Sequence, residues 1–352
     1  MNLRRKVALI LGVIVIVLVA ILYTTSRAII LGSFLDLEKE STQRDVERVR
    51  AAVEDDLSKL NILDGDWAAW NDTYEFIVDQ NQEYIDANLM PDTLINLRLN
   101  IILYLDAESQ VVFSKGIDLE SEEETPLPQS LVIGLTPSNP LLKHSNPRDS
   151  VEGIILLPEG PLLVASHPIV TSEYEGPIRG ALIMARYLTP SEVNRLAGLT
   201  HMALSFSLYD DPQLDPDFLT AKSSITGDQP VYIKPVDSET VAGYTLFEDI
   251  YGDPALILRV MIPRDIYSHG QASITYFFWA LIAVGLLLGS LTILLLERFV
   301  LSRLAKLNKD VNEIGASGEL SAQVSTQGND EISGLAREIN RMLESLDNTE
   351  QA

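Results

Sequence analysis

Residues 276–296 read YFFWALIAVGLLLGSLTILLL, and residues 7–23 read VALILGVIVIVLVAILY. Neither run contains a charged residue, and each approaches the length of about 20 residues that a helix needs to cross a hydrocarbon layer. A buried core helix is seldom apolar on every side. The first run is too long for the apolar part of a cleaved signal peptide, and no small-x-small cleavage site follows it. The sequence therefore predicts transmembrane helices at residues 7–26 and 275–296.

Basic residues mark the cytoplasmic side of both runs. Arg4, Arg5 and Lys6 precede the first run, and Arg298 and Arg303 follow the second. By the positive-inside rule, residues 1–6 and the segment after residue 296 are cytoplasmic, and residues 27–272 lie outside the plasma (inner) membrane. Residues 28–272 hold 40 Asp and Glu against 16 Lys and Arg, so this part carries the whole formal net charge of −24. Such a surface repels nucleic acid.

Residues 27–62 are predicted to form a stalk helix, and residues 63–272 a folded domain. The stalk carries one apolar stripe at spacings of three and four, made of Val46, Val49, Val53, Leu57 and Leu60. This stripe either packs on the chain's own domain or forms a dimer seam. Helices leading into consecutive antiparallel hairpins predict an α+β fold of PAS-like or Cache-like kind. The strands after residue 200 either extend the same sheet or form a second unit.

The stretch DWAAWNDTYEF, residues 66–76, concentrates aromatic side chains. It is predicted to lie in a helix over residues 66–79, with Asp64 or Asp66 as its cap. On such a helix, Trp67, Trp70 and Tyr74 share one face. An aromatic face with a few polar atoms is typical of a ligand pocket, and equally of an ordinary core. The spacing leaves both interpretations open.

A longer block, DGDWAAWNDTYEFIVDQNQEYIDANLMPDTLINLRLNIILYLD at residues 64–106, resembles the opening signature of the fourth class of CHASE domains. EGPLLVASHPIVTSEYEGPIRGALIMARYL, residues 159–188, resembles the hairpin and following strand of the same family. The resemblance implies an extracytoplasmic sensory module of a signalling receptor. The positions that match in the first block are Asp66, Trp70, Asp72, Tyr74, Phe76, Tyr84, Asn88, Leu89 and Asn100.

The aromatic face and the resemblance together define the candidate ligand-binding residues. These are Asp66, Trp67, Trp70, Asp72, Tyr74, Tyr84, Asn88 and Asn100. For Asn88 and Asn100, the alternative role is to satisfy backbone groups at turns. The four histidines show no paired ligand spacing, and we expect no metal or cofactor.

The segment ERFVLSRLAKLNKDVNEIGASGELSAQVSTQGNDEISGLAREINRMLESL, residues 297–346, contains two heptad-like helices separated by a break. Each helix would expose an apolar seam, so a second chain is expected to complete a parallel four-helix bundle. The segment resembles a HAMP signal relay, predicted at residues 297–348. One departure is Arg303, which stands where the family usually has proline. The predicted relay residues are Arg303, Leu304, Leu307, Gly318, Leu320, Val324, Asp330, Glu331, Ile332 and Leu335.

No catalytic motif is visible in these residues, so we expect a signal receptor rather than an enzyme. The receptor is expected to be a homodimer, joined through its stalk, membrane and HAMP helices. Binding of an extracytoplasmic ligand or protein would favour one of its two conformations, and the HAMP domain would pass this change to an output domain. The expected output domain is a cyclic-di-GMP enzyme or a histidine kinase. This domain is either missing because the chain is truncated or carried by a separate partner protein. Two alternatives are a membrane-anchored adaptor for a periplasmic protein and an exported enzyme.

Overall fold

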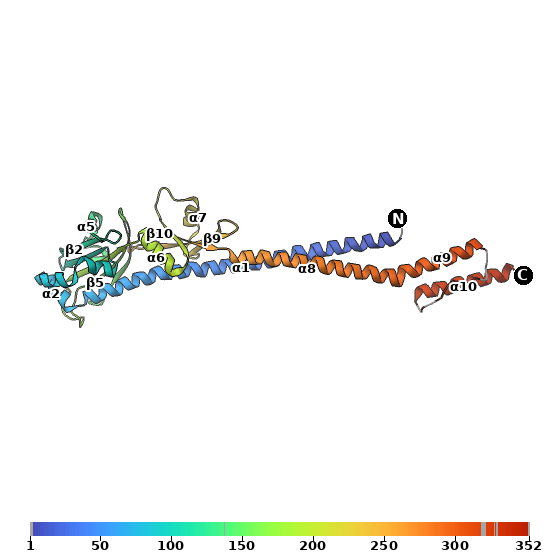
Figure 1. The fold of residues 1–352 in the computed structure, drawn as a ribbon. Helices are drawn as coiled ribbons and strands as arrows, with labels where there is room; N and C mark the ends of the chain where they lie inside the picture. The colour runs from blue at the N-terminus through green and yellow to red at the C-terminus, as the bar shows by residue number, and fades with distance from the viewer. Residues whose placement is uncertain (1–2, 137, 318–321, 327, 329, 351–352) are drawn as a thin grey trace. The chain divides into compact units, whose positions relative to one another are not determined.

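The computed structural model describes residues 3–136, 138–317, 322–326, 328 and 330–350 (Figure 1). The chain divides into two compact units, residues 36–266 and residues 1–35 with 267–352, here called the sensor unit and the relay unit. The predicted relay residues Gly318 and Leu320 fall outside the described residues.

The helices alternate with strands only in the sensor unit. The helices are α1 (Leu3–Ala68), α2 (Asn71–Asp79), α3 (Gln82–Asn88), α4 (Pro91–Leu97), α5 (Gln129–Gly134), η1 (Pro140–Leu142), α6 (Pro190–Thr200), α7 (Pro216–Ser224), α8 (Asp265–Leu296), the π-helical η2 (Glu297–Leu301), α9 (Ser302–Ser317) and α10 (Glu331–Glu350). The strands are β1 (Ile101–Asp106), β2 (Val111–Asp118), β3 (Glu123–Thr125), β4 (Val151–Leu157), β5 (Gly160–Pro168), β6 (Gly180–Tyr187), β7 (Ala203–Leu208), β8 (Val231–Pro235), β9 (Thr240–Glu248) and β10 (Pro254–Pro263).

The sensor unit contains two antiparallel sheets. The first has six strands in the order β3-β2-β1-β6-β5-β4, and the second has four in the order β7-β10-β9-β8. The strands after residue 200 thus form a sheet of their own, within the same compact unit as the first sheet. The α+β fold class predicted from the sequence is confirmed.

Alternation along the strands places a core on each face of the first sheet. In β1, Ile102 and Tyr104 face the core that α1 to α4 cover, while Ile101, Leu103 and Leu105 face the other side. Successive side chains of a strand point to opposite faces, so a strand buried on both sides reads as a continuous apolar run. Leu131 of α5 and Leu141 of η1 cover this second face.

The second sheet is covered by α1 on one face and α7 on the other. The Cα of Gly243 in β9 lies so close to α1 that a Cβ there would stand 2.3 Å from a methyl group of Val46. On the far face, Phe218 and Ala221 of α7 pack against Tyr244 and Ile257. Residues 210–228 are rich in Asp, Pro and Ser, a composition that predicts a loop, but α7 forms within them; a helix this short buries too few side chains to show a periodic pattern.

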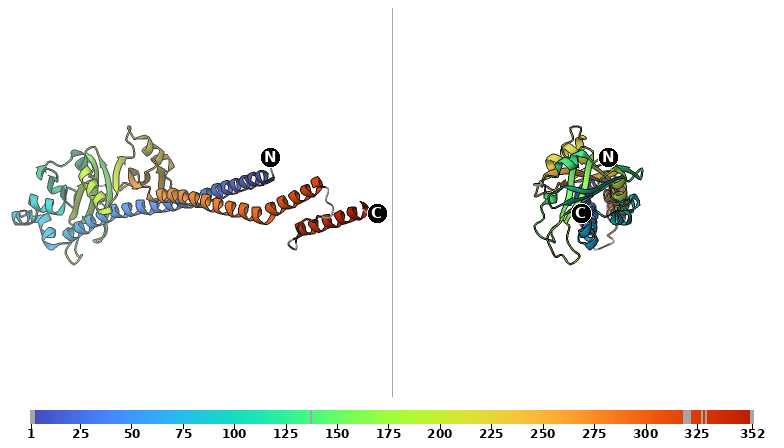
Figure 2. Two further views of the ribbon diagram at one scale, coloured as in Figure 1. Left: turned by 45° about the vertical axis from the view of Figure 1, so that its right-hand side comes forward. Right: turned by 90° about the vertical axis from the view of Figure 1, so that its left-hand side faces the viewer.

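The apolar stripe of the stalk is buried within its own chain. Val46 and Val49 have no exposed surface, and Val53 and Leu60 expose 2% each. They pack in the same core as the strands of both sheets, along which the later part of α1 runs in the views of Figures 1 and 2. The stripe of the stalk therefore packs on its own domain. Any dimer contact along the stalk has to use the opposite, charged face of α1.

The relay unit contains two apolar helix segments, one in α1 and one in α8. Both are long and apolar enough to cross a membrane. Within this unit, the glycines of the GLLLG stretch in α8, Gly285 and Gly289, lie against Val15 of α1. The rings of Tyr23 and Phe278 meet at 5.0 Å. Small residues at a spacing of four let helix backbones approach closely in lipid. These contacts pair the two segments as neighbouring helices.

Candidate functional site

The predicted helix over residues 66–79 is broken in two. Helix α1 ends at Ala68, and Trp70 has an extended backbone (φ −126°, ψ 134°) at the start of α2. Bonds to the segment after β5 replace the missing helical ones: the Val170 N–H donates to the Ala68 carbonyl at 3.1 Å, and the Ser172 N–H donates to the Asn71 side chain at 3.0 Å. The single-helix prediction was wrong because spacing does not reveal such long-range contacts. Neither Asp64 nor Asp66 caps α2.

Six rings nevertheless converge in an aromatic cluster on the α1 side of the first sheet. The cluster consists of Trp67, Trp70, Phe76, Tyr84, Tyr104 and Phe113. Phe76 stacks on Tyr84 at 4.5 Å between ring centroids and meets Tyr104 edge-on at 5.4 Å. Trp70 lies 5.8 Å from Tyr84 and 6.5 Å from Trp67. Edge-on and offset pairs of this kind stabilise a core beyond the area they bury.

The two phenol hydroxyls of the cluster are hydrogen-bonded to each other. The Tyr84 hydroxyl lies 2.6 Å from the Thr73 hydroxyl and 3.2 Å from the Tyr104 hydroxyl. Burial raises the pKa of Tyr84 and, more strongly, the pKa of Tyr104. Both phenols therefore stay neutral at ordinary pH and act as bridges inside the core.

The remaining candidate residues lie apart from the rings. Asp66 and Asp72 are exposed. Tyr74 donates from its hydroxyl to the Pro177 carbonyl at 3.1 Å, and the Arg179 guanidinium stacks 3.6 Å above its ring. The structure thus brings Trp67, Trp70 and Tyr84 together and leaves Asp66, Asp72 and Tyr74 elsewhere.

Both asparagines bond to the main chain. Asn88 donates to the Tyr84 carbonyl one helical turn back, at 3.1 Å. Asn100 precedes β1, donates to the Ile117 carbonyl of β2 and accepts from the Tyr187 N–H of β6, each at 2.9 Å. Asn100 therefore ties together three neighbouring strands at one end of the sheet.

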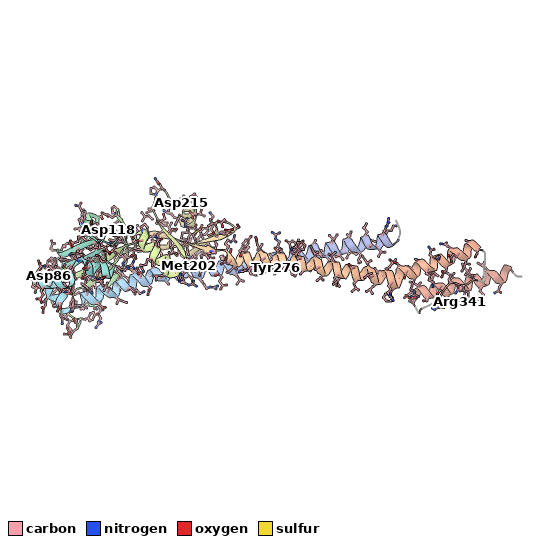
Figure 3. The ribbon with its side chains drawn as sticks, viewed as in Figure 1. Asp86, Asp118, Met202, Asp215, Tyr276 and Arg341 are labelled. Atoms are coloured by element: carbon pink, nitrogen blue, oxygen red, sulfur yellow. The ribbon has the colours of Figure 1, made fainter. Side chains whose placement is uncertain are left out.

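A large cavity opens at this same end of the first sheet. Its volume is about 790 Å³, within the range of small-molecule sites. Among the eight candidate ligand-binding residues, only Asn100 lines it. The lining comes from the end of α4, the end of β2, the turn between β4 and β5, and the segment from Tyr187 to Glu192 that leads into α6. Asp118, the last residue of β2, marks its place in Figure 3. We call this space the sensor cavity.

An ion network leads from the sensor cavity to α1. Arg98 and Glu192, which both line the cavity, form an ion pair. Glu192 also accepts from Arg195 at 2.8 Å, and Arg195 lies 2.7 Å from the Asp56 carboxylate in an ionic contact that is not aligned as a hydrogen bond. Arg186 donates to Asp56 at 3.0 Å and to the Arg98 carbonyl at 2.6 Å.

The charged forms of Glu192 and Arg186 are stabilised by their partners, although both side chains are largely buried. Burial by itself would raise the pKa of Glu192, but hydrogen bonds and charge from Arg195 and Arg98 outweigh it and lower that pKa. Burial lowers the pKa of Arg186, and Asp56 opposes the change. Sequence reasoning missed these five residues, because they are spread over positions 56 to 195 and share no local motif.

One buried acid stands outside any ion pair. Asp64 of α1 has no exposed surface, and neither carboxyl oxygen has an aligned hydrogen-bond partner among the described residues, although the main chain of His167 and Met184 approaches it. Burial raises the pKa of Asp64 well above its ordinary value. A neutral carboxylic acid is therefore part of the contact between α1 and the first sheet.

The described relay residues gather between α9 and α10. Leu307, Ile314, Val324 and Ala336 form a small core, and Ile332 packs against it. The Asn340 side chain accepts from the Val324 N–H at 2.8 Å and donates to its carbonyl at 3.0 Å, which fixes the connector to α10. Leu304 is half-buried, whereas Leu335 is 52% exposed.

Arg303 has a specific contact that a proline could not make. Its guanidinium pairs with Asp330 at the start of α10 and donates to the Ser333 hydroxyl at 2.9 Å. Asp330 in turn accepts from the Ser333 N–H at 3.0 Å, while Glu331 is the first residue of the helix and is exposed. The start of α9 is thereby linked to the start of α10.

No group of three or more His, Asp or Glu side chains that could hold a metal ion occurs in the part of the chain that the structure describes.

Comparison with known proteins identifies two domain families. Residues 52–207 match the CHASE4 domain, and residues 295–348 match the HAMP domain. The methanogenesis regulatory histidine kinase FilI of Methanothrix harundinacea (strain 6Ac) is 32% identical over 352 residues, which is 100% of this chain and 39% of FilI. The chain therefore spans about two fifths of the length of that relative.

Solved sensor domains show a distant likeness. The sensor domain of the histidine kinase DctB of V. cholerae aligns with a TM-score of 0.38 at 14% identity, over 66% of this chain and 98% of that one. The periplasmic domain of Vibrio cholerae LuxQ aligns with a TM-score of 0.40 at 10% identity, over 63% of this chain and 99% of that one.

The family matches agree with the order of elements described above: an α+β sensor unit lies in sequence between two helices able to cross a membrane, and the second leads into the helix pair α9 and α10. Neither domain is catalytic. The chain contains a CHASE4 domain followed by a HAMP domain, which is the architecture of a transmembrane signalling receptor.

Proposed function

We propose that this chain is the sensing and relay part of a homodimeric receptor in the plasma membrane, with residues 27–272 outside the cytoplasm and both termini inside. The observation that carries the proposal is the position of the two apolar segments, which bracket the sensor unit in sequence and carry basic flanks on their far sides. We take the domain limits proposed from the sequence, with the stalk at residues 27–62 and the HAMP domain at 297–348, as part of this proposal.

The event sensed is binding of an external ligand or protein to the sensor unit. A ligand can shift the receptor only by as much as it binds one of its two states more tightly than the other. The sensor cavity, which is large and tied to α1 through charged side chains, suits this role. The aromatic cluster packs on the α1 side of the first sheet, and its exposed neighbours Asp66 and Asp72 remain candidates for contact with a partner.

The output we propose is a kinase-type domain, since the relative FilI is named a histidine kinase. The sensor unit and the HAMP pair would control such a domain without chemistry of their own. The bias would pass from α8 through α9 and α10 as a small shift or rotation of helices.

The dimer is proposed from an apolar stripe on α10 that is exposed in the part of one chain that the structure describes. Leu335, Met342 and Leu346 recur at spacings of seven and four and expose 52%, 61% and 48% of their surfaces. Ile332 and Ile339, on the adjacent face, already pack against α9. A helix pair with a second apolar stripe buries it by pairing with a second copy, which gives the four-helix bundle expected of the family.

Cysteine cross-linking tests this arrangement, because the chain has no native cysteine. Leu335→Cys and Met342→Cys, each introduced alone into the full chain in membranes, are expected to form disulfide-linked dimers under mild oxidation, since core positions bring the two copies within disulfide range. Arg337→Cys is the matched control, because a residue two positions along lies about 200° around the helix. Equal cross-linking at all three positions, or at none, would rule out the proposed bundle.

A further inference from the structure

Arg98 is the basic side chain that the sensor cavity presents to a ligand. It is the one Lys or Arg among the lining residues, and its side chain is 44% exposed. Its left-handed backbone (φ 58°) ends α4 and turns the chain toward β1. In the described structure the guanidinium makes one ion pair, with Glu192, so most of its five N–H donors remain available to an acceptor in the cavity.

The opposite charge is also present and unpaired. Asp118, Glu120 and Glu159 line the same cavity, and none of the three has an ion-pair partner among the described residues. With Arg98 and Glu192 neutralising each other, these carboxylates leave the lining negative. A simple anion would be repelled by them, and a simple cation would leave the Arg98 donors unused. Ile117, Leu119 and Leu188 add apolar wall between the charged groups.

Arg98 also connects the sensor cavity to the stalk helix α1, through two routes of contacts. One route runs through Glu192 and Arg195, and the other runs from the Arg98 carbonyl through Arg186. Both routes end on the same carboxylate, Asp56 of α1. A group that competes with Glu192 for Arg98 therefore changes the balance of charge around a helix that continues, in sequence, into the first apolar run.

We propose that the sensor cavity binds a small zwitterion, a molecule with one carboxylate and one ammonium group such as an amino acid, and that the ion network passes its binding to α1. This proposal rests on the receptor function proposed above. The ligand carboxylate takes the free donors of Arg98, its ammonium group meets Asp118, Glu120 or Glu159, and Arg98 loosens from Glu192. The state in which Arg98 faces the ligand is the one that binds more tightly, and this difference drives the response.

Matched probes separate the two charges. The full chain in nanodiscs is titrated calorimetrically with each natural amino acid, and then with two analogues of the amino acid that binds best: the acid that lacks its ammonium group and the amine that lacks its carboxylate. We expect at least one amino acid to bind, and its two single-charge analogues to bind about tenfold more weakly or worse. No binding by any amino acid, or equal binding by one of the analogues, overturns the proposal.

Two variants locate the site and the route. Arg98→Ala is expected to weaken the binding of the best amino acid about tenfold or more, since it removes a charge-assisted pair, while Lys143→Ala, an exposed charge outside the lining, leaves it unchanged. Ligand-dependent hydrogen exchange over residues 50–60 reports the response of α1. Asp56→Asn should keep binding and lose this response.

Controls keep these results interpretable. Thermal melting of the ligand-free variants checks that they fold, and Arg195→Met, at a partly exposed position, replaces Asp56→Asn if the latter does not. An unchanged response in a folded Asp56→Asn variant would contradict the proposed route. The cross-linking of α10 is independent of this cavity, so failure of the ligand proposal is distinguishable from failure of the receptor function.

Discussion

Replacing Arg264 with alanine is expected to lower the free energy of unfolding of the sensor unit by about 3–5 kcal/mol. Arg264 and Glu38 are each 7% exposed and form a bidentate pair, with contacts of 2.8, 3.1 and 3.2 Å. Arg264 also donates to the Asp237 carbonyl at 3.0 Å. Removing the guanidinium leaves the Glu38 carboxylate buried without its counter-charge. Denaturant unfolding of the full chain, followed by the fluorescence of Trp67 and Trp70, measures the loss.

A double variant separates an uncompensated charge from lost packing. Glu38→Leu combined with Arg264→Met should recover most of the stability, because apolar side chains of similar volume often replace a buried ion pair at little cost. Arg44→Ala is the control on the same helix, since Arg44 pairs with Glu40 on the surface and such pairs contribute about 0–1 kcal/mol. A loss no larger for Arg264→Ala than for Arg44→Ala would contradict the account.

This pair has a bearing on signalling. Glu38 lies on α1, and Arg264 is the residue directly before α8. The pair therefore joins the two segments of the sensor unit that continue, in sequence, into the apolar runs. Any displacement that reaches the membrane helices has to move both partners together or break their contact.

Asp64→Asn is expected to stabilise the sensor unit at pH 8, because a carboxyl group held protonated by the fold costs about 1.4 kcal/mol of stability for each pH unit above its unfolded-state pKa, and an amide does not. Burial raises the pKa of Asp64 well above its ordinary value, so the folded protein holds a proton that the unfolded chain releases above about pH 4. Stability should then fall as the pH rises from there toward the folded-state pKa. Asparagine cannot ionise, and it removes this slope.

Unfolding of both proteins between pH 5 and pH 8 at ~1-unit steps measures the effect, as a difference in slope between the variant and the parent. Asp66→Asn provides the control, because Asp66 lies two residues away and is exposed. Parallel pH profiles for the parent and Asp64→Asn would show that Asp64 is ionised in the folded state, contrary to its surroundings of Tyr104, His167 and Met184.

Much of the fold could be predicted from local patterns. Apolar runs on either side of residues 106–109 predict a hairpin, and β1 and β2 form it. Residues 189–199 read as a capped helix, and α6 forms there with the Thr189 side chain as its cap. These elements carry their signals in neighbouring residues, through alternation, turn residues and caps.

What escaped prediction depends on contacts between distant parts of the chain. The break at Trp70 is held by residues about 100 positions away, and the short helices α3, α4 and α7 bury too few side chains to show a period. The aromatic residues were recognised as one face, but spacing could not tell a pocket from a core. Asn100 alone among the candidates lines the sensor cavity, and the charged residues beside it meet only once the sheet has formed.

In the proposed receptor, the sensor unit and the helices α9 and α10 lie on opposite sides of one membrane. Single cysteines at Ser121, in the exposed segment between β2 and β3, and at Glu344, exposed on α10, test it with a membrane-impermeant maleimide, since the parent chain has no cysteine. In intact cells the account predicts labelling of Ser121→Cys alone, with Glu344→Cys labelled only after the membrane is permeabilised. Labelling of both positions in intact cells, or of neither, would contradict it.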